Sequence, residues 1–388
     1  MKKIGLVVCY KIKNYGSMLQ SFALQQYFVQ KEIPFECINY VHKKDLLDSV
    51  KKLSLLFVKS ARMMKFRVLK SILVTKFFVP QDLKKLLLER IQKFEDFSKT
   101  HFVVSEEINT KEKLIQLSKN YKSVIVGSDQ VWHPINYGTH FYDLSWVDPS
   151  VPKFAYASSF GVSKVPFLIR NGVAMALKSF DKISCREKTG SDIVYNLIAK
   201  KAETLPDPTL LWSADEWNKM LDLDNLRTKN ESYIFCYFLG NSPECYEFAN
   251  RLKKITGLKI IAPILLDGYY PETLKFGDEH PFDVGPADFV WFIKNADFVC
   301  TDSFHGTVFS LLFQKKVAIF NRYKQKSSVS ANSRIYDLFN LLGIKRNIWE
   351  NAEKFSVSKP YDIKEFETAL ATARQKSFNY LQRITGEN

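Results

Sequence analysis

Three residues that could hold an anionic substrate and protonate it, His305, Gly306 and Thr307, follow one another in the 388-residue chain. They begin a stretch with helical spacing, and the free N–H groups and positive dipole end at a helix N-terminus bind anions. An imidazole titrates near neutral pH and can move a proton. We therefore predict group transfer from a phosphorylated donor, with His305 as the catalytic residue. The alternative is a histidine that only caps its own helix.

The residues around this triplet predict a strand, a tight loop, a helix and a second strand within residues 297–320. Residues 298–300 form an apolar run typical of a buried parallel strand. The run stops at Thr301, Asp302 and Ser303, which favour turns and helix N-caps. The triplet should therefore lie at the carboxyl end of a strand, where parallel sheets bind their ligands.

Several other predicted strands are followed by loops whose residues suit ligand binding. In a doubly wound sheet, the carboxyl ends of the strands meet at one crevice. We expect these loops to converge there, although Ser17 also suits the N-cap of the helix that follows its loop. With Gly306 and Thr307, the predicted substrate-binding residues on these loops are Asn14, Gly16, Ser17, Gly127, Ser128, Asp129, Gln130, Ser158 and Ser303.

Two charged residues on these loops are candidates for more specific roles. Arg186 follows the predicted strand 182–185, and its planar guanidinium could bind phosphate or carboxylate; it could equally form a salt bridge to Glu187. Asp129 could orient or deprotonate a hydroxyl, or cap the turn after it. We predict Arg186 as a second catalytic residue.

The order of the predicted elements indicates an α/β fold with two Rossmann-like domains that face a cleft. A β-α-β unit begins at residue 3, and a second α/β half begins at Tyr233. The first loop is not a G-x-G-x-x-G fingerprint, so a dinucleotide is not implied. We predict an N-terminal domain over residues 1–222 with a helical insertion at 43–100, a C-terminal domain over 223–360, and a final helix within 361–388 that packs back on the N-terminal domain.

Composition narrows the class of protein. The six cysteines form no C-x-x-C pair, and the chain begins without a signal-peptide pattern, so we expect a cytoplasmic protein. No motif has metal-ligand spacing, and we expect no metal and no cofactor. The net charge is +15, and residues 43–99 carry fifteen basic and six acidic side chains. This local excess does not suggest nucleic-acid binding. Residues 43–79 are either a helical insertion or a basic helix on an anionic membrane surface.

The chain resembles the polysaccharide pyruvyl transferase family. Six pieces in order carry the resemblance: NYGSMLQSFALQQYF (14–28), VIVGSDQVWHP (124–134), YASSFG (156–161), SCREKTG (184–190), DPTLLW (207–212) and TDSFHGTVFSLLF (301–313). The resemblance implies a fold of the GT-B type, with the last helix packed across the N-terminal domain. It also implies transfer of a pyruvyl group from phosphoenolpyruvate to a sugar, commonly as a 4,6-ketal on a hexose such as galactose.

The resemblance also assigns residues and partners. It implies that His305 is the essential histidine, that Arg186 is the arginine of an S-x-R-[DE] motif, and that the acceptor is a lipid-linked precursor of a bacterial capsule or exopolysaccharide. The protein would then work at the inner face of the membrane. Many members carry arginine two residues before the histidine, where this chain has Ser303. The cations that could replace it are Arg186, Lys315, Arg322 and Arg334.

Two other functions fit the same sequence. A nucleotide-sugar glycosyltransferase of the GT-B type would use the same helix end to hold a diphosphate. A non-catalytic protein that binds sugar or membrane would account for the missing arginine at position 303.

Overall fold

The computed structural model of the chain describes residues 2–41, 81–229, 231–240, 242–264, 274–322, 333–344 and 361–386. The predicted helical insertion is seen only from α4 (Gln81–His101) onward. The segment 43–79, which the sequence leaves open between a helical insertion and a basic helix on a membrane surface, lies outside the described residues.

The N-terminal half contains a parallel sheet of six strands in the order β2-β1-β3-β4-β5-β6. All residues of the central strands β1 and β3 are buried, as expected for a sheet covered on both faces. The strands are β1 (Ile4–Val7), β2 (Phe35–Cys37), β3 (Ser123–Val126), β4 (Lys153–Ser158), β5 (Lys182–Cys185) and β6 (Glu203–Thr204). Its helices include α1 (Tyr15–Gln30), α5 (Lys111–Ser118), α6 (Phe167–Lys178) and α7 (Lys188–Ile198), with the 3-10 helix η2 (Pro134–Thr139) before β4.

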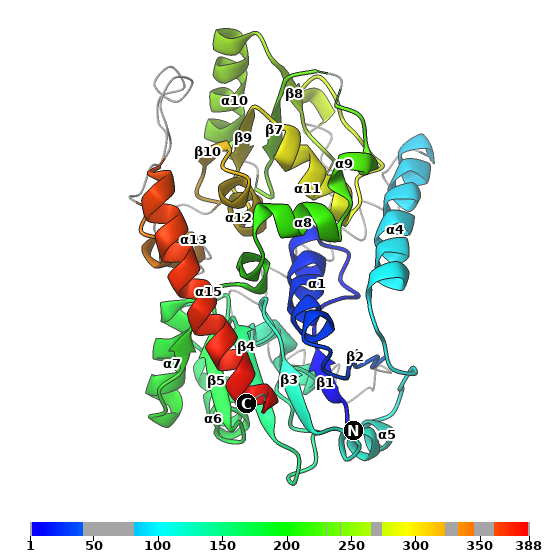
Figure 1. The fold of residues 1–388 in the computed structure, drawn as a ribbon, viewed down its shortest axis with the longest axis vertical. Helices are drawn as coiled ribbons and strands as arrows, with labels where there is room; N and C mark the ends of the chain where they lie inside the picture. The colour runs from blue at the N-terminus through cyan, green and yellow to red at the C-terminus, as the bar shows by residue number, and fades with distance from the viewer. Residues whose placement is uncertain are drawn as a thin grey trace.

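The C-terminal half contains a second parallel sheet, in the order β10-β9-β7-β8. Its strands are β7 (Tyr233–Tyr237), β8 (Lys259–Ile261), β9 (Phe298–Thr301) and β10 (Lys316–Ile319). Its helices include α10 (Pro243–Thr256), α11 (Pro286–Asn295), α12 (Phe304–Leu312) and α13 (Ser333–Leu341). Two parallel sheets flanked by helices confirm the predicted α/β fold with two Rossmann-like halves (Figure 1).

Helix α1 joins the two halves. The ring of Tyr15, its first residue, stacks on Phe289 of α11 with 4.6 Å between ring centroids. The Tyr15 hydroxyl also donates a hydrogen bond to the carbonyl of Val284 at 3.0 Å. Residues from both sheets therefore belong to one buried core cluster, and residues that follow β1, β3, β7 and β9 line one cavity, so carboxyl ends of the two sheets meet there.

Three short helices connect the sheets: η3 (Pro208–Leu211), α8 (Ala214–Met220) and α9 (Leu223–Leu226). The domain boundary at 222/223 stays a prediction. The C-terminal helix α15 (Ile363–Thr385), red in Figure 1, lies across the N-terminal half. The Tyr380 hydroxyl donates to the Ala155 carbonyl of β4 at 2.9 Å, and the Arg374 guanidinium donates to the carbonyls of Leu210 and Trp212. No helix in the described part of the chain is long and apolar enough to cross a membrane.

The start of α1 differs from the sequence-based expectation. Asn14, and not Ser17, is the N-cap, and its side chain accepts a hydrogen bond from the Ser17 N–H at 3.2 Å. Asparagine is as good an N-cap as serine, and capping from position 14 adds a first turn to the helix. Ser17 therefore lies within that turn, and its hydroxyl reaches the loop after β3.

Candidate active site

A cavity of about 240 Å³ lies where the carboxyl ends of the two sheets meet. Its wall includes residues from α1, from the loop after β3, from the start of α12 and from α13, so both halves contribute. The predicted site residues that line it are Asn14, Ser17, Asp129, Gln130, Ser303, His305, Arg322 and Arg334.

The predicted residues that do not line the cavity are Gly16, Gly127, Ser128, Ser158, Arg186, Gly306 and Thr307, and several of them are bonded to one another or to Ser303. Ser303 is the N-cap of α12, as the sequence indicates, and its side chain accepts from the Gly306 N–H at 3.3 Å. The Thr307 hydroxyl donates to the Ser303 carbonyl at 2.9 Å. The Ser158 hydroxyl donates to the Gly127 carbonyl at 3.0 Å and so joins β4 to β3. These contacts fix the helix end and the sheet edge around the cavity.

His305 crosses from the C-terminal half into the N-terminal half. Its Nε2 lies 3.4 Å from Oδ2 of Asp207, and Nε2 has no hydrogen-bond partner among the described residues. A Cβ atom built at Gly16 of α1 would lie 1.9 Å from His305 Nδ1. The imidazole therefore occupies the space that a side chain at position 16 would fill, and Gly16 is the residue that admits it.

Asp207 is the residue at the centre of the site that sequence reasoning missed. Its carboxylate is fully buried and accepts hydrogen bonds from Arg186 Nη1 at 2.6 Å, from the Ser128 hydroxyl at 3.1 Å and from the N–H and hydroxyl of Thr209. Burial alone would raise the pKa of Asp207, but His305 and Arg186 lower it well below its usual range. In the sequence, Asp207 lies in a connector between two prolines. The signal that could have identified it as a site residue is its position in the DPTLLW piece, which the chain shares with the family it resembles.

Arg186 is buried behind the cavity and is held mainly by Asp207. Its guanidinium also lies 3.8 Å from Asp129 and 3.7 Å from Glu187, and it stacks over the Phe304 ring at 4.5 Å. Burial lowers the pKa of Arg186, and the three carboxylates raise it more, so the net shift is upward. Nε and Nη2 have no hydrogen-bond partner within the described ranges, so two donors remain on a fixed cation.

Asp129 presents a second carboxylate at the cavity wall. Its backbone is left-handed, with φ of 71°, a conformation that aspartate adopts more readily than most residues. The Ser17 hydroxyl donates to Oδ2 of Asp129 at 2.5 Å. Burial raises the pKa of Asp129, but the opposing effect of Arg186 and His305 is larger, so the pKa lies below its usual value. An ionised carboxylate therefore faces the same hollow as His305.

Arg322 and Arg334 bring positive charge to the side of the cavity near Ser303. Nη2 of Arg322 donates to the Asp302 carbonyl at 3.3 Å. Burial, together with Arg186 and Arg322, lowers the pKa of Arg334 to about 10. Lys315 lies at the other end of α12, where burial and nearby lysines lower its pKa, and it does not line the cavity.

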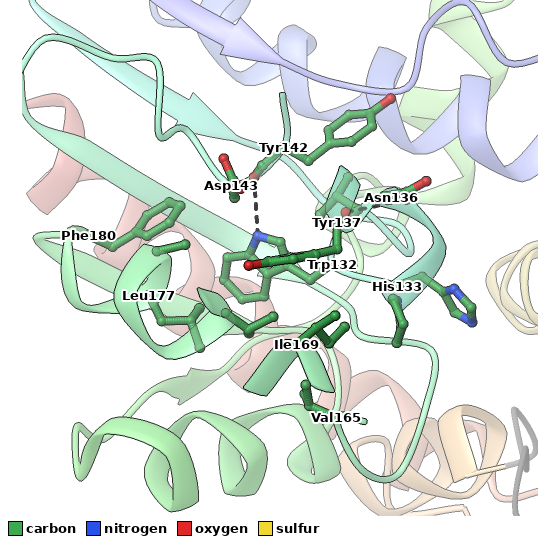
Figure 2. A pocket seen from close by; sticks show the side chains of 14 residues that line it. Trp132, His133, Asn136, Tyr137, Tyr142, Asp143, Val165, Ile169, Leu177 and Phe180 are labelled. Carbon is green, nitrogen blue, oxygen red and sulfur yellow. Dashed lines mark hydrogen bonds between the residues drawn. The ribbon is translucent and has the colours of Figure 1, made fainter. Parts of the chain in front are cut away.

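A small apolar pocket of about 30 Å³ adjoins the cavity (Figure 2). It shares His133 and Asn136 with the cavity and continues between η2 and α6, with Val165 and Ile169 in its wall. Trp132 is part of this packing, because its indole N–H donates to the Tyr142 carbonyl at 3.2 Å. Among the described residues, no cluster of three or more His, Cys, Asp or Glu side chains could hold a metal ion.

Comparison with known proteins agrees with this architecture. A family model described as polysaccharide pyruvyl transferase matches residues 14–323, a range that includes strands β2 to β10 and most residues of the cavity wall but not β1 or Arg334. No curated protein matches the chain. Among solved structures, S. aureus MnaA with UDP is similar, with 14% identity, a TM-score of 0.50, and 100% of this chain and 97% of that chain covered.

A second similar structure is the UDP-GlcNAc 2-epimerase from Neisseria meningitidis bound to UDP-GlcNAc. It has 10% identity and a TM-score of 0.47, with 99% of this chain and 100% of that chain covered. The likeness to solved structures concerns the fold alone, which is of the GT-B type.

Proposed function

Because the chain belongs to the polysaccharide pyruvyl transferase family, we propose that it transfers a pyruvyl group from phosphoenolpyruvate to two hydroxyls of a sugar. The acceptor is proposed to be a hexose such as galactose in a lipid-linked precursor of a bacterial capsule or exopolysaccharide, and the product a 4,6-ketal. The family model covers His305, Arg186 and Arg322 and ends before Arg334.

The observation that carries the proposal is the pair of arginines beside His305 in one cavity. Phosphoenolpyruvate carries a phosphate and a carboxylate, and arginine binds both groups with its planar fork. Arg322 and Arg334 lie on the same wall as Ser303, so they stand in for the arginine that many family members have at that position. Burial and repulsion by Arg186 and Arg322 lower the pKa of Arg334, and a bound dianion would relieve the repulsion.

The proposed chemistry begins with proton transfer to the methylene carbon of phosphoenolpyruvate, which makes C2 an oxocarbenium-like electrophile. A sugar hydroxyl attacks C2 and loses its proton, which replaces the one given to the methylene carbon. The C2–O bond to phosphate then breaks, and a second hydroxyl attacks C2 and closes the ketal, its proton leaving with the phosphate as hydrogen phosphate. His305 lines the cavity and is the proposed proton carrier; its Nε2 is buried 3.4 Å from Oδ2 of Asp207 and has no hydrogen-bond partner among the described residues. Asp129 is the proposed acceptor of a hydroxyl proton, and Arg186 adds positive charge behind the reacting groups.

The test is an assay of phosphate release from phosphoenolpyruvate with a panel of galactosides, glucosides and N-acetylmannosaminides. His305→Gln should abolish ketal formation and leave the unfolding temperature close to that of the wild type. Wild-type turnover in this variant would contradict the assigned role. UDP release from a UDP-sugar in place of phosphate release would identify a glycosyltransferase, and calorimetry without any phosphoenolpyruvate binding would favour a non-catalytic protein.

The donor site is tested by comparing a substitution in the cavity wall, Arg334→Met, with one outside it, Lys315→Met. Arg334→Met should raise the KM for phosphoenolpyruvate at least tenfold, about 1.4 kcal/mol, and leave the KM for the acceptor unchanged. Lys315→Met removes a cation from the far end of α12 and should change neither constant. Equal effects of the two substitutions would rule out a specific anion site at Arg334.

A further inference from the structure

Helix α6 exposes large apolar side chains on its outer face. Phe167, Leu168 and Met175 are 88%, 71% and 75% exposed, and Tyr195 of the adjacent helix α7 is 55% exposed. Single exposed apolar residues are common, but a group of large ones on one helix face indicates an interaction surface. We call Phe167, Leu168 and Met175 the α6 apolar face.

The charged side chains on the segment that carries this face have one sign. Residues 161–179 contain Lys164, Arg170 and Lys178 and no aspartate or glutamate, and all three basic side chains are exposed. A helix with apolar side chains outside and flanking basic residues has the pattern of an interfacial helix on an anionic lipid surface. Two copies of the same chain paired through this face would bring like charges together, which opposes a symmetric dimer there.

The inner face of α6 is firmly packed, so the outer face is a fixed surface. Ile169 and Leu177 are buried against the pocket shown in Figure 2. A Cβ atom at Gly172 would lie 1.6 Å from the Tyr137 hydroxyl, so the glycine lets η2 approach α6 closely. Because residues of η2 line both the apolar pocket and the cavity, η2 lies between α6 and the cavity.

We propose that the α6 apolar face docks on an anionic lipid bilayer. Phe167, Leu168 and Met175 enter the boundary between headgroups and acyl chains, and Lys164, Arg170 and Lys178 contact lipid phosphates. This surface differs from the segment 43–79, for which membrane contact is one of two sequence-based alternatives. The benefit of membrane docking to catalysis rests on the proposed function. A lipid-linked sugar is held in the plane of the membrane, and docking through α6 places the cavity beside that plane.

The experiment is co-flotation of the full chain with phosphatidylcholine vesicles, with and without roughly one third phosphatidylglycerol. The wild type should float with anionic vesicles and remain at the bottom with neutral ones. Phe167→Ser/Leu168→Ser/Met175→Ser should lower the floated fraction at least fivefold, and Lys164→Gln/Arg170→Gln/Lys178→Gln should have a similar effect. The matched control is Leu88→Ser, because Leu88 is 63% exposed on α4, away from the α6 apolar face. This variant should float as the wild type does.

Two further measurements decide the other outcomes. The triple serine variant should keep the unfolding temperature of the wild type and its phosphate release with a soluble acceptor, because the three side chains are exposed. Failure of the phosphate-release assay would affect the proposed function and leave the flotation result in place. No flotation of the wild type, or equal flotation of the serine variant, overturns the proposal. Loss of a wild-type dimer in that variant, measured without lipid, would identify the face as a contact between copies and also overturn it.

Discussion

Substitution of Gly16 by alanine should inactivate the protein through His305 without unfolding it. The added Cβ would lie 1.9 Å from His305 Nδ1, and ordinary van der Waals contact begins at 3.4 Å, so the ring must move by roughly 1.5 Å. The imidazole is a movable side chain, and the backbone at Gly16 is not left-handed. Alanine also favours a helix over glycine by up to about 1 kcal/mol. The displaced group is therefore the histidine and not the fold.

A shift of this size separates His305 from Asp207 and from the substrate. Misplacement of a reacting group by about 1 Å can reduce the rate a hundredfold, and we expect at least that loss in kcat for ketal formation. The assay is phosphate release from phosphoenolpyruvate with the best acceptor of the panel, together with thermal unfolding. Gly138→Ala is the control, because a Cβ atom there meets nothing within 4 Å.

A double variant tests whether the effect passes through the histidine. If Gly16→Ala acts only by moving His305, adding it to His305→Gln should cause no further loss. Wild-type kcat in Gly16→Ala would refute the reasoning. So would a double variant far less active than His305→Gln alone, because Gly16 would then have another role.

Three further predictions follow from the charges of the site. Asp207→Asn should lower kcat about a hundredfold or more. Because the pKa of Asp207 in the folded protein lies below the usual range, its ionised carboxylate stabilises the fold at neutral pH, and this stabilisation is lost below about pH 4. In urea titrations, acid should therefore lower the unfolding free energy of the wild type more steeply than that of the variant. Burial and Arg334 lower the pKa of His133 to about 4, so the unfolded chain takes up a proton at higher pH than the folded one. The unfolding free energy of the wild type should therefore fall by up to about 3 kcal/mol between pH 6.5 and 4. His133→Asn should remove most of this fall, and an unchanged pH dependence of the unfolding free energy in the variant would contradict it. Inorganic phosphate should raise the unfolding temperature of the wild type more than that of Arg334→Met, and equal shifts in differential scanning fluorimetry would exclude anion binding there.

Much of the fold could be predicted because its signals are local. The buried strands are short apolar runs, and Ser303 has the residue type and position of an N-cap. The start of α1 was misassigned because both Asn14 and Ser17 suit an N-cap, and the choice between them depends on contacts made elsewhere. The hydroxyl of Ser17 is used by Asp129, 112 residues away in sequence.

The candidate site was harder to predict because its key distances join distant segments. Residues at strand ends could be expected to converge, but the pairing of Asp207 with both Arg186 and His305 depends on how the connector after β6 runs between the halves. Nothing in the sequence around Gly16 indicates that its missing side chain makes room for a residue of the other half. Likewise, Arg322 and Arg334 could be separated from Lys315 only once the faces of α12 and α13 were known.

The fit of His305 against Gly16 also limits how such a chain can be recombined. Gly16 lies in α1 of the N-terminal half and His305 in α12 of the C-terminal half, so their compatibility is not guaranteed when the halves come from different relatives. A hybrid protein whose N-terminal half carries alanine or serine at position 16 would fold and still lack a correctly placed histidine. Although each half has its own sheet, the two halves must match at positions 16 and 305. Hybrids joined at the connector should therefore be screened first for glycine at position 16.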